Sequence, residues 1–320
     1  MKLVFCGTPR FAVPTLEALL AAGDEVALVV TQPDRPVGRT RELTAPPVKI
    51  AALAAGLEVT QPERIRDNQE FRARLESIAP DAIVVVAYGR LIPPWMLSLP
   101  RLGCINLHAS LLPRYRGAAP IQWAVAMGDV FTGNTTMLLE EGLDTGPLLL
   151  QQALAIGTEQ TAADLFDVLA EGGAPLVVKT LAGLDDGSIQ PKPQNHNGAT
   201  LAPLLTREDG RMDFSAHTAT GLRNRWRGFQ PWPGAFTTLD GKKVIVHRLC
   251  IAELSNLAAL ASADPGLILV QDHRLFAACA QSTWLELLEV QLEGKKRMTA
   301  AEFLRGNALA HGARLGIQAQ

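Results

Sequence analysis

Two polar side chains stand two residues apart near the end of a predicted strand, within the segment GCINLHASLLPRYRG. Residues i and i+2 of a strand point to the same side, so we expect Asn106 and His108 to face the same way. Buried polar side chains cost free energy unless they are hydrogen-bonded or used in binding or chemistry. The spacing alone is therefore compatible with a satisfied structural pair and with a functional site.

A third polar residue, Asp144, lies in the glycine-flanked segment GLDTGP, where the backbone can turn tightly. One explanation for an aspartate in such a turn is purely structural, because its side chain can form hydrogen bonds to the nearby backbone. Together with Asn106 and His108, it could instead help to stabilise an oxyanion, move a proton and orient the imidazole. Ser110 lacks the sharp GxSxG turn that exposes a nucleophile, so we expect direct transfer between two bound substrates.

Other chemistries are disfavoured by what the sequence lacks. The first strand is followed by GTPRFA, which is not the GxGxxG fingerprint of dinucleotide-binding proteins, so a nicotinamide-dependent dehydrogenase is not expected. The four cysteines are scattered without any CxxC spacing, so we expect buried thiols and no metal site.

The elements that must position these residues alternate between strand and helix patterns. Strands are predicted at residues 3–6, 26–30, 81–87 and 103–108, and helices at 11–20, 48–55, 71–78 and 121–127. Such alternation predicts an α/β fold with right-handed crossovers and a mostly parallel, Rossmann-like sheet. Sheets of this kind bind ligands at the carboxyl ends of their strands.

The pattern changes after a stretch rich in glycine, proline and aspartate. We predict a catalytic domain at residues 1–183, a linker at 184–206 and a C-terminal domain at 207–320. Following a helix near residues 217–225, short strands are predicted at 235–239, 243–249, 267–270, 275–280 and 284–290. Short strands separated by turns suggest a small β-rich barrel of the OB type.

Composition and charge set the broad class. Hydrophobic residues make up 48% of the 320-residue chain and charged residues 19%, which is typical of a folded globular protein. The N-terminal apolar run is too short for a signal peptide or a membrane span, so we expect a soluble, cytoplasmic protein. We also expect a monomer. Net charge is −2, but residues 207–320 are net positive, which favours contact with a nucleic acid there.

These motifs resemble those of the folate-dependent formyltransferases. The similarity runs through FCGTPRFA, VVVAYGRLIP, GCINLHASLLPRYRGAAPIQWA and GLDTGP. The additional segments TQPDRPVGR and FQPWPGAF are similar to the members of the family that act on methionyl-tRNA. The resemblance covers most of the chain. It implies a Rossmann-like formyltransferase domain followed by a barrel-like domain that helps to hold tRNA.

The resemblance also implies a reaction and its residues. The formyl group of 10-formyltetrahydrofolate would pass to the α-amino group of methionyl-initiator tRNA, with no metal required. The family's catalytic asparagine, histidine and aspartate fall on Asn106, His108 and Asp144. The segment expected to contact the folate comprises Ser110, Leu111, Leu112 and Pro113. The loop that reaches the acceptor stem in the family holds Arg39 and Arg41 here, as candidate tRNA contacts.

Several alternatives stay open. Glu42 follows the candidate tRNA arginines and would weaken attraction to phosphate. The basic residues at 223–227 surround a tryptophan, as in RNA-binding surfaces, but could equally belong to a packed helix end. The competing activities are formyl transfer to a sugar amine or to glycinamide ribonucleotide, and an inactive RNA-binding protein with the same fold.

Overall fold

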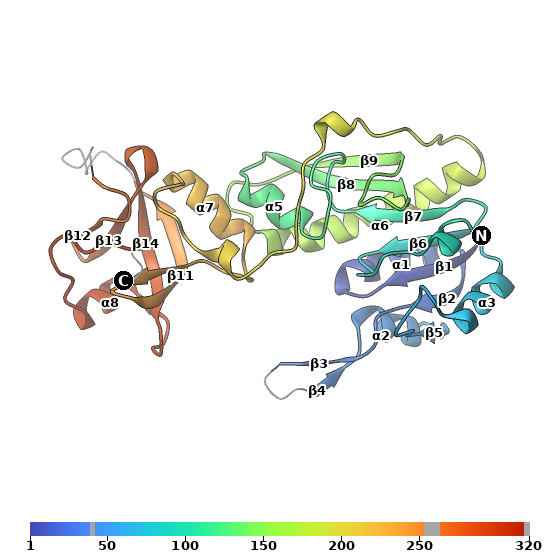
Figure 1. Cartoon of the computed structure of the whole chain (residues 1–320), viewed down its shortest axis with the longest axis horizontal. Coiled ribbons are helices and arrows are strands. Elements are labelled where there is room, and N and C mark those ends of the chain that lie inside the picture. Colours follow the sequence, from blue (N-terminus) through green and yellow to red (C-terminus); the bar gives the residue numbers. More distant parts are fainter. Residues whose placement is uncertain (39–41, 253–262, 317–320) are drawn as a thin grey trace. The chain divides into compact units, whose positions relative to one another are not determined.

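The computed structural model describes residues 1–38, 42–252 and 263–316, and the chain forms two compact units. The first unit comprises Met1–Ile121, Phe131–Ile156 and Asp164–Pro203, and the second comprises Gln122–Val130, Gly157–Ala163 and Leu204–Gln320. Each unit has a sheet of its own (Figure 1).

The first unit is built on a seven-stranded sheet in the order β5-β2-β1-β6-β7-β8-β9. Its strands are β1 (Lys2–Gly7), β2 (Glu25–Val30), β5 (Val59–Thr60), β6 (Ala82–Val86), β7 (Cys104–His108), β8 (Phe131–Leu138) and β9 (Leu148–Ala155). The strands from β5 to β7 pair in parallel, whereas β8 and β9 are antiparallel to their neighbours. The predicted mostly parallel α/β sheet is confirmed, and β8 and β9 are additional strands that the sequence analysis did not predict.

Helices cover the sheet of the first unit on both faces. They are α1 (Val13–Ala21), α2 (Pro47–Ala54), α3 (Gln69–Ile78), α4 (Pro94–Leu97) and α6 (Ala162–Asp185), with short 3-10 turns at Arg10–Ala12 and His196–Gly198. The helix α5 (Pro120–Ala126) begins in the first unit and belongs to the second unit from Gln122 onward. On one face, Ile83 and Val85 pack with Leu75 of α3 and Met96 of α4. On the other face, Leu107 of β7 contacts α6 so closely that a Cβ on Gly173 would lie 2.5 Å from the leucine.

A small antiparallel hairpin projects from the first unit (Figure 1). It consists of β3 (Arg35–Val37) and β4 (Glu42–Thr44). Its base is fixed by Asp34, which accepts hydrogen bonds from Lys49 Nζ at 2.7 Å and from Gln61 Nε2 at 2.7 Å. These contacts hold the pKa of the Asp34 carboxyl below its usual range.

The second unit contains a six-stranded antiparallel sheet in the order β10-β11-β14-β13-β12, with β15 paired to β14. Its elements are α7 (Ala219–Gly228), β10 (Phe236–Leu239), β11 (Lys242–Ile251), β12 (Ile268–Gln271), β13 (Arg274–Cys279), β14 (Thr283–Leu292), β15 (Met298–Thr299) and α8 (Ala300–Gly306), with 3-10 turns at Glu208–Gly210 and Ala280–Ser282. All five predicted strands are present, and every bound lies within two residues of its predicted position.

The chain near residue 315 connects the two edges of this sheet. The Gly316 N–H donates to the Thr238 carbonyl in β10, and the Leu315 N–H donates to the Gly266 carbonyl just before β12. Leu315 itself is buried in the core together with Phe303 and Leu285. The β-rich, barrel-like C-terminal fold expected from the sequence is therefore confirmed.

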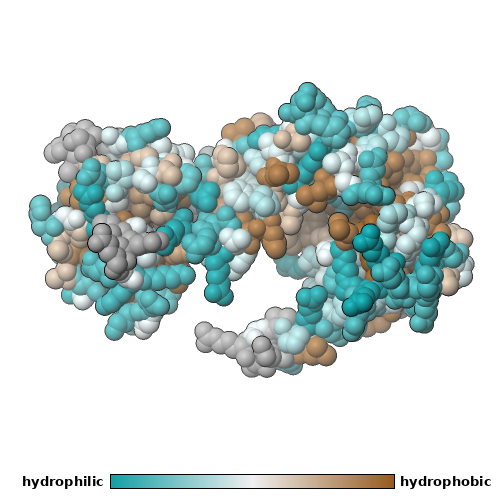
Figure 2. Space-filling model, in the orientation of Figure 1, coloured by the Kyte–Doolittle hydropathy of each residue, from teal (hydrophilic) through white to brown (hydrophobic). Residues whose placement is uncertain are grey.

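The surface drawn in Figure 2 is mainly hydrophilic, with apolar side chains scattered over it. Within the described ranges, every helix falls short of the length or the apolar character needed to cross a membrane.

Candidate active site

Asn106 and His108 lie on one face of β7, at its carboxyl end. The intervening Leu107 is buried on the opposite face, against α6. Cys104, two residues before Asn106, packs in the cluster under α3 and α4. Because successive strand residues alternate, Asn106 and His108 follow Cys104 on that face, where the helical cover gives way to loops.

The loop between β8 and β9 brings Asp144 to His108. The carboxylate Oδ2 of Asp144 lies 3.6 Å from Nδ1 of His108, and the two side chains are 13% and 6% exposed. The same oxygen accepts a hydrogen bond from the Gly117 N–H at 2.8 Å. The distance of 3.6 Å is too long for a hydrogen bond, so the contact is a close pairing of an imidazole edge with a carboxylate.

The other side of the imidazole is fixed by the main chain. Nε2 of His108 lies 2.9 Å from the carbonyl oxygen of Tyr115. A carbonyl can only accept, so Nε2 carries a hydrogen in this arrangement. Nδ1 is then the ring nitrogen that faces the Asp144 carboxylate. Both ring nitrogens therefore face oxygen atoms of the protein.

The Asn106 amide is held by its strand and by no other side chain among the described residues. Its neighbours in the sheet are Val85 of β6 and Met137 of β8, both of which are buried. Asn106 is half-buried, and within the described part of the chain its side chain has no hydrogen-bond partner. A half-buried amide of this kind can donate a hydrogen bond to a ligand without first breaking one within the protein.

The loop that carries Asp144 depends on close backbone approach. Asp144 has a φ of +49°, in the left-handed region that few residues other than glycine adopt. A Cβ on Gly146 would lie 1.9 Å from the Leu138 carbonyl oxygen, so only glycine fits there. Gly117, which holds the Asp144 carboxylate, has a φ of +124°, and a Cβ on it would lie 2.6 Å from the Ala202 carbonyl oxygen.

The segment expected to contact the folate follows β7 directly and is tied internally. The Ser110 hydroxyl is fully buried and donates to the Arg114 carbonyl at 2.7 Å. Thr135 Oγ1 donates to the Ser110 carbonyl at 2.6 Å and accepts from the Leu112 N–H at 3.2 Å. Leu111 and Pro113 are half-buried, so they are the members of this segment that a ligand could reach directly.

The candidate tRNA arginines of the N-terminal loop, Arg39 and Arg41, lie outside the described residues. The structure does describe the three arginines of α7, and all three form hydrogen bonds within the second unit. Arg223 donates to the Thr158 carbonyl at 3.0 Å and pairs with Glu159. Arg227 is 5% exposed and donates to the Gly157 carbonyl at 2.9 Å.

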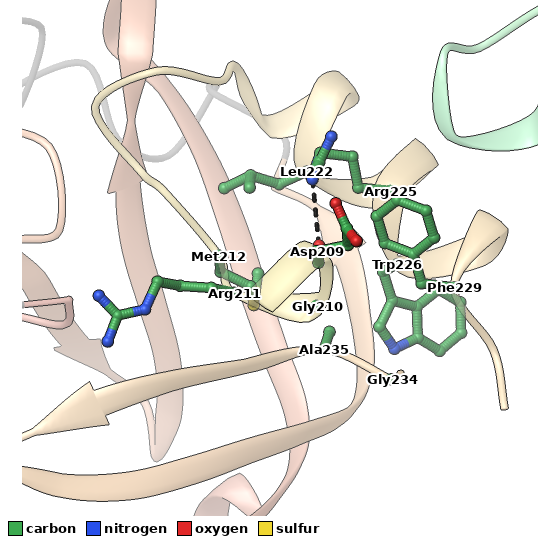
Figure 3. A pocket seen from close by; sticks show the side chains of 10 residues that line it. All are labelled: Asp209, Gly210, Arg211, Met212, Leu222, Arg225, Trp226, Phe229, Gly234 and Ala235. Carbon is green, nitrogen blue, oxygen red and sulfur yellow. Dashed lines mark hydrogen bonds between the residues drawn. The ribbon is translucent and has the colours of Figure 1, made fainter. Parts of the chain in front are cut away.

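Arg225 is likewise part of the packing of α7. It donates to the Asp209 carbonyl at 3.0 Å and lies over the Phe229 ring, 4.9 Å from its centroid (Figure 3). These residues and Trp226 line a cavity of about 10 Å³, which is room for a single water molecule. The packed-helix interpretation of these arginines fits the structure better than an RNA-binding surface.

The sequence analysis did not identify two residues that contact the site. Tyr115 contacts His108 with its carbonyl, and Gln194 contacts the Asp144 loop with its amide. Gln194 donates to the carbonyls of Asp144 and Gly146 across a separation of 50 and 48 residues. Hydrogen bonds at such separations leave no local signal. Among the described residues, no three His, Cys, Asp or Glu side chains come close enough together to hold a metal ion.

The fold and this arrangement define a transferase of the formyltransferase class. The family model described as "Formyl transferase" matches residues 1–181, and "Formyl transferase, C-terminal domain" matches residues 204–308. The chain therefore belongs to the formyl transferase family.

Its relatives point to one branch of that family. It is 64% identical over 316 residues to the methionyl-tRNA formyltransferase of Acidobacterium capsulatum, covering 99% of this chain and 100% of the relative. It is 56% identical to the enzyme of the same name from Koribacter versatilis, covering 96% of each chain.

Solved structures agree on the fold. The sugar 3N-formyl transferase WlaRD, crystallised with dTDP and 5-N-formyl-THF, matches with a TM-score of 0.63 at 15% identity, over 92% of this chain and 99% of that one. The N-formyltransferase of Helicobacter canadensis, in complex with folinic acid and dTDP-3-aminofucose, matches with a TM-score of 0.63 at 16% identity, over 90% of this chain and 98% of that one.

Proposed function

We propose that this chain transfers the formyl group of 10-formyltetrahydrofolate to the free α-amino group of methionyl-initiator tRNA, giving N-formylmethionyl-tRNA for translation initiation. The observation that carries the proposal is the His108–Asp144 pair beside an Asn106 amide without a hydrogen-bond partner among the described residues. The 64% identity to a methionyl-tRNA formyltransferase over the full length supports the choice of acceptor.

The reaction needs a donor to the formyl oxygen. The amine nitrogen attacks the formyl carbon, a C–N bond forms, and negative charge develops on the oxygen of the tetrahedral intermediate. The Asn106 amide and the Nδ1–H of His108 face the same side of β7, where both can donate to that oxygen. The bond to N10 of the folate then breaks, and the formyl group remains on the amine.

Protons must move in the same step. The attacking amine loses a proton and N10 of the folate gains one, so the net proton count is unchanged. Asp144 keeps a carboxylate 3.6 Å from Nδ1 of His108, which places a negative charge beside the ring that donates to the oxyanion. The carboxylate can also take part in passing the proton from the amine to N10, through His108 or a water molecule.

The two substrates are assigned to different parts of the chain. Ser110, Leu111, Leu112 and Pro113 form the folate-contacting segment, with Leu111 and Pro113 accessible to the ligand and the other two supporting them. Arg39 and Arg41 contact the phosphates of the tRNA. The domains are 1–183 for catalysis, 184–206 as linker and 207–320 for tRNA binding, in a chain that acts as a monomer in the cytoplasm.

The direct test is formyl transfer from 10-formyltetrahydrofolate to methionyl-tRNA, with free methionine and a dTDP-linked amino sugar as alternative acceptors. We expect transfer to methionyl-tRNA and negligible transfer to the other two. Preferential formylation of the amino sugar would contradict the proposal, and so would the absence of transfer to every acceptor. Sedimentation analysis of the purified chain tests the monomer.

A further inference from the structure

Gln194 is a buried polar residue that no step of the proposed reaction uses. It lies beyond the end of α6, in a segment otherwise exposed on both sides, and it is only 5% exposed. A buried amide is costly unless its donors and acceptors are all paired. The partners of Gln194 therefore indicate why an amide stands at this position.

Its amide is fully used, and each end has a different kind of partner. Oε1 accepts hydrogen bonds from Arg116 Nε at 3.2 Å and Nη2 at 2.6 Å. Nε2 donates to the carbonyls of Asp144 at 2.8 Å and Gly146 at 2.7 Å. An arginine can only donate and a carbonyl can only accept, so these partners fix the orientation of the amide.

The loop that Gln194 holds is the one that aims Asp144. Asp144 adopts a left-handed backbone conformation, which costs free energy and persists only where the surroundings impose it. The two bonds from Gln194 hold the carbonyls of Asp144 and Gly146, on either side of Thr145. They therefore set the direction in which the Asp144 carboxylate leaves the backbone.

The opposite end of the network reaches the same carboxylate by a second route. Arg116 holds Oε1 of Gln194, and the N–H of the next residue, Gly117, donates to Oδ2 of Asp144. Arg116 also contacts His196, because the same Nη2 that donates to Gln194 lies 3.0 Å from Nδ1 of His196. Gln194 thus connects the main chain of Asp144 to Arg116, and the neighbour of Arg116, Gly117, holds the Asp144 side chain.

We propose that Gln194 is a positioning residue for formyl transfer, and that its amide fixes the Asp144 carboxylate at its distance from His108. The proposal rests on the proposed function, because it gives Gln194 an effect on the reaction only through Asp144. Misplacement of a catalytic group by about 1 Å can cost on the order of 10²-fold in rate.

Gln194→Glu tests this with little change of shape. The carboxylate can still accept from Arg116, but it cannot donate to the two carbonyls and repels them instead. We expect kcat to fall by roughly 10- to 100-fold, with the KM values for the folate and the tRNA little changed. Gln190→Glu is the matched control, since Gln190 is exposed in the same segment and, among the described residues, its side chain donates only to the Gly187 carbonyl. It should keep the unaltered rate.

A second variant covers the case in which Gln194→Glu does not fold. Gln194→Met removes the four hydrogen bonds without adding charge, and its kcat per folded molecule should also fall. A role in folding alone would lower the melting temperature of both variants and leave kcat per folded molecule unchanged. That result would overturn the proposal.

A double-mutant cycle separates this proposal from the proposed function. In the background of Asp144→Asn, a further Gln194→Glu change should cost much less than it does in the unaltered chain, because both act through one carboxylate. Equal costs in the two backgrounds would overturn the positioning role while leaving the proposed function intact. If the unaltered chain transferred no formyl group to methionyl-tRNA, the proposed function would fall, and this proposal with it.

Discussion

At the scale of single residues, the protein holds its three candidate catalytic side chains in different ways. His108 is fixed from both sides, by the Tyr115 carbonyl and the Asp144 carboxylate, whereas Asn106 is fixed only by its strand. A ring that is contacted at both nitrogens is suited to keeping one orientation. An amide without a hydrogen-bond partner in the described part of the chain is suited to donating to a group of the substrate, such as an oxyanion.

Replacement of Asn106 tests the oxyanion role. Asn106→Ala removes one donor, and we expect the rate of formyl transfer to fall by ~10²–10³, the usual loss for one oxyanion-hole donor. Asn106→Asp keeps the size of the side chain but has no side-chain N–H, so it should lose as much. Single-turnover measurements with both substrates saturating check this. An aspartate variant as fast as the unaltered chain would assign Asn106 to packing.

The charge of Asp144 is tested by Asp144→Asn. Asparagine tolerates the left-handed backbone and can still accept from Gly117, so the variant should fold normally. The neutral amide no longer places a negative charge beside Nδ1 of His108, and we expect formyl transfer to slow by at least ~10²-fold.

Asp240 provides the matched control for that change. Its φ of +48° is nearly that of Asp144, and it occupies a turn between β10 and β11 of the second unit. Asp240→Asn should leave both the melting temperature and the rate unchanged. A full rate in Asp144→Asn would reduce Asp144 to a turn residue.

How much of the site the sequence could predict depends on the kind of group. Asn106, His108 and Asp144 were singled out because their side chains are polar and stand in a short strand end or a glycine-flanked turn. The Tyr115 carbonyl could not be found, since a main-chain acceptor has no signature in the residue type. Gln194 could not be found because its hydrogen bonds bridge 50 residues.

At the scale of elements, the loop between β8 and β9 depends on glycine for its shape. Gly146→Ala would place a Cβ 1.9 Å from the Leu138 carbonyl at the end of β8. We expect it to lower the free energy of unfolding by roughly 1–3 kcal/mol and to slow formyl transfer, because the displaced loop carries Asp144.

Gly306→Ala is the control, since no atom of the described residues lies within 4 Å of a Cβ there. Denaturant unfolding and the transfer assay measure both effects. A Gly146→Ala protein as stable and as active as the unaltered chain would contradict the account of this loop.

The start of β6 is tied to β1 by a charged residue, which makes its stability dependent on pH. The Lys2 N–H and Arg101 bind the Asp81 carboxylate and hold its pKa below the ordinary value of 3.8. A lowered pKa in the folded state contributes stability above the ordinary value, and this contribution is lost as pH falls through the folded pKa.

Asp81→Asn should therefore be less stable than the unaltered chain at neutral pH, and the difference should shrink as pH falls below about 4. Urea unfolding over a pH series measures the difference, with the exposed Asp67→Asn as control. A difference that stayed constant with pH would exclude the carboxylate as its source.

Two of the elements that the sequence analysis missed, β8 and α6, contain buried polar groups or helix-breaking residues. In β8, Asn134 donates to the Leu169 carbonyl at 2.8 Å, and Thr136 lies 2.8 Å from the Thr180 hydroxyl. Polar residues that are buried in this way hide the strand pattern. The 24-residue helix α6 contains Pro175 and two consecutive glycines, and these residue types predict the end of a helix. The strands of apolar, β-branched residues were predicted because burial alone accounts for them.

At the scale of the whole molecule, interactions between distant segments define the second unit. Arg227 of α7 binds the carbonyls of Gly157 and Gln160, and Trp123 meets Phe229 with ring centroids 5.4 Å apart. Composition can suggest a change of fold along the chain, but it cannot show which earlier segments pack with the later one. The α7 arginines illustrate this, because their role follows from these interactions and their sequence pattern does not reveal it.

The tRNA contacts are expected at basic side chains other than those already paired with acidic groups or carbonyls of the protein. The base of the hairpin is neutralised by the Asp34–Lys49 pair, and the guanidinium groups of α7 are bound to carbonyls and Glu159. Binding to phosphates releases counterions, so log Kd depends linearly on log salt, and the slope changes by about one unit for each phosphate that a variant no longer binds. The proposed contacts Arg39 and Arg41 should therefore alter this slope when they are removed.

Arg39→Ala and Arg41→Ala should each weaken tRNA binding and reduce the salt slope by about one unit, while kcat at saturating tRNA stays the same. Arg72→Ala is the control, because Arg72 is an exposed arginine of α3 that pairs with Glu76. It removes the same charge, so a general effect of net charge would appear there too. Filter binding or fluorescence titration from low to high salt gives the affinities. If the slopes of both loop variants equalled those of the unaltered chain, the loop would have no phosphate contact, and the acceptor stem would have to be held by other residues.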